Sequence, residues 1–364
     1  MKRRRFGLLA LLVAAVAAAA VVVVRAAEDG TPDADELGRI AEEINRQVPN
    51  VGLGEGSPAP PDAGEWKTDF SKRLVPLEEF QAGGPPKDGI PAIDNPRYRY
   101  ARDVDYLEDR EPVILVRVGD DARAYPLRIL VWHEIVNARF GNLPVAVTFC
   151  PLCNTAIVFD RRVDRRTLSF GTTGMLRDSD LVMYDRQTES WWQQFGGQAL
   201  VGRLAGKKLR QLPARIVAWE EFRRAHPDGL VLDIFTGFSR NYGANPYPGY
   251  DSIDSSPLFP VRNADDDRLP AKERVVYVEV DDHAFAVPYP ALAEKRRIEI
   301  DVDGKRLVVT WRRGVASALD DVVLARGRDV GAANVLVDGR PVPFTEPFWF
   351  TVAAFRPDIE IVED

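Results

Sequence analysis

Parts of this chain repeat one another, and the repeat limits the possible folds more than any other feature of the sequence. The matching segments are residues 116–126 with 278–288 and 147–149 with 309–311, both at an offset of 162, and residues 219–228 with 349–358, at an offset of 130. Collinear matches at a fixed offset are typical of a duplicated structural unit. The change of offset predicts a degenerate second copy, shorter by about 32 residues. The segment that it lacks is expected between Asp160 and Gln211.

Short β-strands dominate the pattern of both copies. Runs of five or six mostly β-branched or aromatic residues, bounded by Gly, Asp or Pro, are typical of strands. Such runs occur at Val113–Val118, Val145–Phe149, Thr155–Phe159, Leu181–Tyr184, Leu230–Ile234, Val275–Val280 and Leu307–Trp311. Helices are expected to be few and short, at Leu127–Asn137, Ile216–Ala225 and Tyr289–Glu294. We therefore predict a mainly β fold (α+β with few short helices) of two tandem related β-rich units, residues 66–256 and 257–364.

The N-terminal residues have the composition of an export signal. Basic residues 2–5 precede an uninterrupted apolar run, Phe6–Val24, which is long enough to span a bilayer. We predict that residues 1–27 are a cleaved signal peptide or a retained membrane anchor, and that residues 28–65 form a short helix and a Gly/Pro-rich linker. The body is then exported and extracytoplasmic, either secreted or anchored to the membrane. The net charge of the whole chain is −7, and the body is more acidic still, because residues 1–26 hold five basic groups and no acids. This charge argues against nucleic-acid partners, which need a basic surface.

The two cysteines of the chain form a single CxxC motif, Cys150-Pro151-Leu152-Cys153, directly after an expected strand. Two thiols at this spacing can form a reducible disulfide or chelate a soft metal ion as thiolates. They can also be two small buried residues whose disulfide only staples a turn. A thioredoxin fold is not expected, because the residues after Cys153 alternate like a strand instead of forming a helix.

Four other residues are candidates to assist the cysteines. His133 can act as a base for a thiol or as a third metal ligand, although a histidine bonded to a backbone carbonyl explains it equally well. Arg177, Asp178 and Asp180 belong to the segment that the second copy lacks, and they can orient a thiol or a ligand. Turn capping is the structural alternative for them. The possible cofactors are copper(I), for which two thiolates suffice, and zinc, which a lone CxxC without paired histidines disfavours.

These motifs resemble the domain-of-unknown-function family 3179. The strings that carry the resemblance are residues 125–137, 144–153, 179–186, 240–250 and 270–275, and the resemblance spans residues 70–360. The family has no established activity, but some members carry selenocysteine in the CxxC-type motif. This implies redox work at Cys150 or Cys153, because selenium improves a nucleophile or a leaving group. We therefore predict a thiol/disulfide redox protein, a possible thiol-disulfide oxidoreductase.

The partner of such a protein would be an unknown redox partner or a small-molecule or peptide ligand, and the membrane if the N-terminal segment is retained. Two alternatives stay open. One is a copper(I) or other soft-metal binding module that uses the same cysteines, with His133 as a further ligand. The other is a non-catalytic cell-surface β-domain with a structural CxxC.

Overall fold

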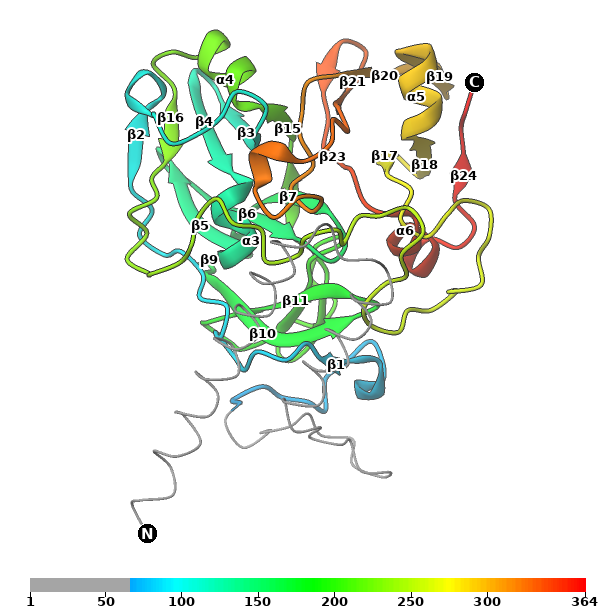
Figure 1. Cartoon of the computed structure of the whole chain (residues 1–364). Coiled ribbons are helices and arrows are strands. Elements are labelled where there is room, and N and C mark those ends of the chain that lie inside the picture. Colours follow the sequence, from blue (N-terminus) through cyan, green and yellow to red (C-terminus); the bar gives the residue numbers. More distant parts are fainter. Residues whose placement is uncertain (1–65) are drawn as a thin grey trace, which may run out of the picture. The chain divides into compact units, whose positions relative to one another are not determined.

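The structure is a computed structural model that describes residues 66–364. These residues belong to one compact unit, Asp62–Asp364. Strands make up 40% and helices 12% of the structure, so the predicted mainly β fold is confirmed. Five sheets of four or five strands are arranged as the blades of a propeller-like ring (Figure 1). The signal, anchor and linker predicted for residues 1–65 lie outside the described residues.

The first copy of the repeat contributes two of these sheets, with the orders β15-β3-β4-β16-β2 and β14-β7-β6-β5. The strands are β2 (Tyr98–Tyr100), β3 (Pro112–Val118), β4 (Asp121–Pro126), β5 (Ile135–Phe140), β6 (Leu143–Cys150), β7 (Thr155–Asp160), β14 (Arg210–Leu212), β15 (Ala214–Ala218) and β16 (Leu230–Leu232), and the helices are α3 (Leu127–His133) and α4 (Trp219–Ala225). Neighbouring strands are antiparallel, except that β4 and β16 are parallel.

The second copy builds the equivalent sheets, β23-β17-β18-β24 and β19-β20-β21-β22. Its elements are β17 (Val275–Val280), β18 (His283–Pro288), α5 (Tyr289–Lys295), β19 (Arg297–Val302), β20 (Lys305–Arg312), β21 (Ala332–Val337), β22 (Arg340–Pro341), β23 (Phe344–Thr345), α6 (Trp349–Phe355) and β24 (Glu360–Ile361). The parallel pair recurs, between β18 and β24. The bounds of β20 match those of β6 at the offset of 162, and those of α6 match α4 at the offset of 130. The predicted duplication is thus confirmed.

The fifth sheet has the order β1-β10-β11-β12-β13 and is largely an insertion into the first copy, between β7 and β14. Its strands are β1 (Gln81–Ala82), β10 (Phe170–Arg177), β11 (Asp180–Asp185), β12 (Trp191–Gln193) and β13 (Ala199–Val201), and the small hairpin of β8 (Arg162–Val163) and β9 (Arg166–Thr167) precedes it. The predicted position of the missing segment is therefore confirmed. The second copy also gains residues, because its β20–β21 connection spans residues 313–331 whereas the β6–β7 turn spans only 151–154.

Two predicted helices were too long. Helix α3 ends at His133, because Glu134 adopts a positive φ of 55° and reverses the chain, so that the expected end of the helix forms β5 instead. The apolar start of the helix predicted at Ile216–Ala225 lies in β15, which pairs with β3 along its whole length. In both cases pairing with a buried neighbouring strand overrides the local helical pattern.

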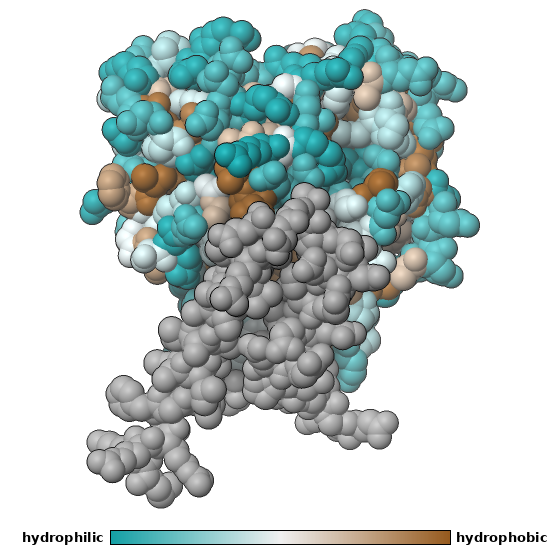
Figure 2. All heavy atoms as spheres, viewed as in Figure 1, coloured by the Kyte–Doolittle hydropathy of each residue, from teal (hydrophilic) through white to brown (hydrophobic). Residues whose placement is uncertain are grey.

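The largest hydrophobic core of the described residues contains Phe149, Phe159, Trp192 and both cysteines. A second core joins the two sheets of the second copy. The connection between the copies, residues 233–274, forms no helix or strand, yet it packs on the largest core through Tyr242 and Tyr250. The long connection is therefore part of the folded unit. On the face that Figure 2 shows, hydrophobic residues form small separate areas on a mainly hydrophilic surface.

Candidate functional site: a buried dithiol with an unpaired carboxylate

The CxxC motif forms the turn between β6 and β7. Cys150 is the last residue of β6 and pairs with Thr155 in the sheet register. The turn closes through Asn154, which adopts a positive φ of 57°. Both cysteines are free thiols, and their exposed fractions are 1% for Cys150 and 0% for Cys153. The motif is thus part of the hydrophobic core instead of the surface.

Both thiols point at one backbone carbonyl, that of Ser179 in the β10–β11 turn. The Sγ atoms lie 3.8 Å (Cys150) and 3.3 Å (Cys153) from this oxygen, to which the thiols donate. Asp178 and Ser179 form the two central residues of the turn, and both have positive φ values, 52° and 60°. This conformation normally selects Asn, Asp or Gly, so Ser179 is the unusual residue of the turn. Strain of this kind persists where surrounding contacts fix it, and it clusters at functional sites.

Contacts from the long connection hold this strained turn. The Asp178 carboxylate accepts hydrogen bonds from the backbone N–H of Arg262, at 2.9 Å, and from its guanidinium, at 2.6 Å. The Ser179 hydroxyl donates to the carbonyl of Phe259, at 3.0 Å. The Ser179 carbonyl is therefore fixed in its direction toward the thiols.

Asp180 places a carboxylate beside the two sulfur atoms. One oxygen, Oδ2, accepts hydrogen bonds from the backbone N–H of Phe195, at 2.8 Å, and from the side-chain amide of Gln193. The other oxygen, Oδ1, is buried and accepts no hydrogen bond of normal geometry from the described residues, although the nearby Cys153 thiol lowers the pKa of this carboxyl. One ligand atom from each of Cys150, Cys153 and Asp180 can be chosen such that all three lie within 4.8 Å of one another. Burial raises the pKa of the Asp180 carboxyl to about 7.

A buried lysine lies close to the dithiol. The Lys272 amine has no hydrogen-bond partner within residues 66–364 and lies 3.0 Å from the ring centroid of Tyr250 and 4.8 Å from that of Phe348. Tyr250 in turn donates its hydroxyl to the carbonyl of Leu152, inside the CxxC motif, at 3.0 Å. Burial lowers the pKa of Lys272 to about 6, an effect that Cys153 opposes. The lysine therefore belongs to the same electrostatic environment as the cysteines.

Burial also disfavours the charged forms of the other groups at the site. It raises the pKa of the Cys150 thiol, and it raises that of Cys153 well above the ordinary value. It raises the pKa of Glu134 to about 8, with a further contribution from Asp180. At neutral pH burial thus favours the uncharged forms of both thiols, Glu134 and Lys272, whereas Asp180 is close to its midpoint.

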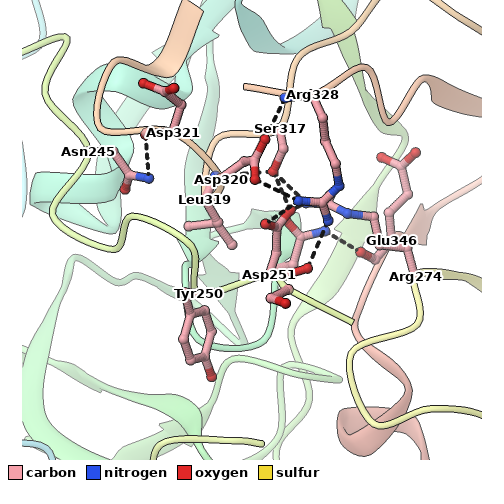
Figure 3. Close-up of polar contacts among 12 residues, drawn as sticks. Asn245, Tyr250, Asp251, Arg274, Ser317, Leu319, Asp320, Asp321, Arg328 and Glu346 are labelled. Atoms are coloured by element: carbon pink, nitrogen blue, oxygen red, sulfur yellow. Dashed lines mark hydrogen bonds and ion pairs between the residues drawn. The ribbon is translucent and has the colours of Figure 1, made fainter. Parts of the chain in front are cut away.

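An ion-pair network centred on Asp251 lies next to Tyr250 (Figure 3). Asp251 follows Tyr250 and pairs with Arg274, at 2.7 Å, and with Arg328, at 2.8 Å. Ser317 bonds to the Asp251 carboxylate and also accepts from Arg274, at 2.9 Å. Ser317 and Arg328 both come from the long β20–β21 connection of the second copy. The network therefore fixes the residues adjacent to Tyr250 and Lys272.

The candidate residues from the sequence are distributed unevenly around this site. Cys150, Cys153 and Asp180 come together as a group of possible ligands. Asp178 supports the turn below the thiols. Arg177 pairs with Glu79, at 2.6 Å, and donates to Gln193, which holds Asp180.

His133 lies outside that group. Its Nδ1 bonds to the carbonyl of Pro91, at 2.7 Å, and its Nε2 to the hydroxyl of Tyr242, at 2.6 Å. Both ring nitrogens are therefore occupied, and no hydrogen bond joins the ring to either cysteine. The next residue, Glu134, contributes to the raised pKa of the Cys150 thiol, and Asp180 in turn contributes to the raised pKa of Glu134.

The sequence reasoning missed Lys272, Tyr250 and Glu134 as site residues. Lys272 and Tyr250 lie in two of the strings that carry the family resemblance, and Glu134 directly follows His133. These strings were the only signal that could have pointed to them. Their distance from the CxxC in the sequence concealed their position beside it.

Comparison with known proteins gives one match. The family model described as "Protein of unknown function (DUF3179)" matches residues 87–359 and so covers the sheets of both copies except for β24. No curated protein and no solved structure matches the chain. Within residues 66–364, no helix has the length and apolar character needed to cross a membrane. Since the match extends over most of the sequence, the chain belongs to the DUF3179 family.

Proposed function

We propose that this protein binds a thiolate-preferring divalent metal ion, zinc, through Cys150, Cys153 and Asp180. One observation carries the proposal: a buried carboxylate oxygen without a partner lies beside two buried thiols, with the three donors within 4.8 Å of one another. Buried polar atoms are nearly always satisfied, so an orphaned one indicates a missing partner such as an ion. Each donor also belongs to a residue type that zinc binds.

The spacing of the donors fits such an ion. With zinc–sulfur distances of about 2.3 Å, a tetrahedral site places two sulfur atoms about 3.8 Å apart. The three donor atoms already lie within 4.8 Å of one another, so small side-chain shifts would bring the two sulfur atoms to this distance. Three protein ligands leave a fourth position for an external donor, as in catalytic zinc sites. The carboxylate favours zinc over copper(I), which prefers soft ligands alone.

The charge of the surroundings also fits a divalent ion. Two thiolates and a carboxylate around a divalent cation leave one net negative charge. A buried net charge is costly unless an opposite charge neutralises it. Lys272 is the buried cation whose charge interacts with Cys153, and its protonated form would complete the balance. The metal would thereby ionise groups that burial otherwise keeps neutral.

The thiol/disulfide redox function predicted from the sequence ranks second. The proximity of the two sulfur atoms favours it, since a CxxC pair in one turn can close into a disulfide. Reactive cysteines, however, are partly exposed and have a lowered pKa, whereas both thiols here are buried and have a raised pKa. Exchange with a protein disulfide would require the connection that carries Tyr250 to move.

The test is a zinc competition titration of the purified full-length chain, reduced and freed of metal, against a chromophoric chelator. We expect one zinc ion per chain, and loss of binding in Cys150→Ser and Cys153→Ser. We expect Asp180→Asn to weaken zinc binding at least tenfold. Asp164→Asn is the control, because this exposed carboxylate pairs with Lys207, at 2.9 Å, in the β8–β9 hairpin and is expected to leave the zinc affinity unchanged.

Three outcomes would overturn the zinc assignment. The first is the absence of stoichiometric zinc binding. The second is equal zinc affinity in Asp180→Asn and the unmodified chain. The third is tight copper(I) binding with the same affinity in Asp180→Asn and the unmodified chain, which would assign the thiols to copper(I) instead. The intact mass of the metal-free chain tests the redox alternative. A mass that is lower by two hydrogens and returns to the reduced value after addition of a reductant identifies the disulfide.

A further inference from the structure

A second possible binding site lies between the sheet of β7 and β14 and the sheet of β17 and β23. It is a pocket of about 290 Å³, outside the group formed by the cysteines and Asp180. Its lining includes Phe195, Lys208, Arg210, Glu279, Phe344 and Thr345. The two β-rich copies thus each contribute one wall.

The pocket combines an apolar body with a few polar groups. Ile157, Leu209 and Phe344 supply aliphatic and aromatic surface. Thr345 is a buried lining residue whose hydroxyl has no hydrogen-bond partner among the described residues. Ligand sites are typically apolar cavities with a small number of placed polar groups, and this lining has that character.

Among the charged groups at the pocket, one cation has only a distant ion-pair partner and no hydrogen bond to it. Arg210 pairs closely with Asp160, at 2.8 Å. The Glu279 carboxylate is already bonded to the Tyr277 hydroxyl and to Arg356. Within residues 66–364, Lys208 forms one ion pair, to Glu279, and at 3.8 Å it is too long for a hydrogen bond. Lys208 is therefore available to an anion.

The volume sets the size of the ligand. A volume of about 290 Å³ lies at the lower end of the range of small-molecule pockets, about 300–1,000 Å³. That matches a small organic acid with one carboxylate and an apolar body. The pocket also adjoins the cysteine site, because the backbone N–H of its lining residue Phe195 bonds to Asp180.

We propose that this pocket binds a small monocarboxylate, with the carboxylate on Lys208 and the apolar body against Phe195 and Phe344. Lys208 supplies a charge-assisted hydrogen bond, and the Thr345 hydroxyl supplies a second donor. The site does not depend on the metal proposal, because none of its residues is one of the proposed ligands.

The probe is phenylacetate, titrated into the full-length metal-free chain and followed by isothermal calorimetry or by chemical shifts. Phenylacetamide, nearly identical in shape but neutral, is the matched ligand control. Lys208→Gln is the test variant. Lys207→Gln is its control, because Lys207 is the adjacent lysine and pairs with Asp164, at 2.9 Å, away from the pocket.

We expect phenylacetate to bind at millimolar concentration or tighter, and phenylacetamide at least tenfold more weakly. Lys208→Gln should weaken phenylacetate at least tenfold, and Lys207→Gln should not change it. Absence of phenylacetate binding at ten millimolar would overturn the proposal. So would equal binding of the acid and the amide, or equal effects of the two lysine variants. Because zinc is absent from the assay, a failure here is distinct from a failure of the zinc titration.

Discussion

Replacing Lys272 with methionine tests whether the site holds a neutral amine in the absence of metal. The amine is buried and unpaired within the described residues, against the ring of Tyr250. Methionine has a similar length and fills the same space without a polar atom. We therefore expect Lys272→Met to stabilise the metal-free protein.

The size of the effect follows from the pKa of Lys272, which burial lowers from 10.5 to about 6. Between these values the unfolded chain binds a proton that the folded chain does not, so the stability of the unmodified protein rises with pH. At pH 7 the difference amounts to about 5 kcal/mol as an upper limit, at about 1.4 kcal/mol per pKa unit. Near pH 10 it falls below about 1 kcal/mol. The advantage of Lys272→Met should shrink accordingly.

The assay is urea denaturation of the reduced, metal-free chain at pH 7 and pH 10. We expect Lys272→Met to raise the free energy of unfolding by about 2–5 kcal/mol at pH 7 and by less than about 1 kcal/mol at pH 10. Lys207→Met is the control, because that amine is exposed and paired with Asp164. A variant that is less stable at pH 7, or a gap that does not change with pH, would refute the reasoning, since the lysine would then be charged and paired in the folded protein.

Three further expectations can be checked by the same denaturation assay. Burial raises the pKa of Asp180 from 3.8 to about 7, so its contribution to folding stability is present below pH 4 and is lost as the pH rises to 7. Relative to the unmodified protein, metal-free Asp180→Asn should therefore gain up to about 4 kcal/mol in the free energy of unfolding as the pH rises across this window. Gly197→Ala places a Cβ 2.5 Å from the Phe159 ring and should be about 2 kcal/mol less stable than Gly196→Ala, which shares a positive φ but meets no atom; equal losses would contradict this. Arg161→Met removes the donor to three backbone carbonyls and should cost about 3 kcal/mol or more, and a loss below about 1 kcal/mol would argue against their burial.

The sequence predicted the architecture well because the repeat and the strands leave local signals. A duplicated unit must keep its alternating apolar positions, so the matches survive at fixed offsets. The offset of 162 alone is enough to align β6 with β20. The helix ends could not be placed, because a single positive φ at Glu134 ends α3, and Glu is an uncommon residue in that conformation.

The candidate site was predictable only where its residues belong to recognisable sequence motifs. The CxxC and Asp180 were named from their motifs, and the structure brings them together. Lys272 lies more than a hundred residues from Cys153, and its position depends on how the connection between the copies packs. His133 was attractive because histidine is a common base and ligand, but its ring nitrogens are both used in bonds to other groups. Proximity in sequence to a motif is weak evidence of proximity in space.

The second copy has lost the cysteines but contributes to the site in another way. Where the first copy has the short CxxC turn, the second has the long β20–β21 connection, with Arg312 and Val315 at the positions of the cysteines. This connection supplies Ser317 and Arg328, which lock Asp251 beside Tyr250. The second copy therefore has, at the position of the thiol-bearing turn, a connection that supports the surroundings of the thiols. The ion pairs and hydrophobic cores around the cysteines stabilise a local arrangement that would otherwise be unfavourable. They explain why the site tolerates a buried lysine, a carboxylate oxygen without a partner and four residues with positive φ.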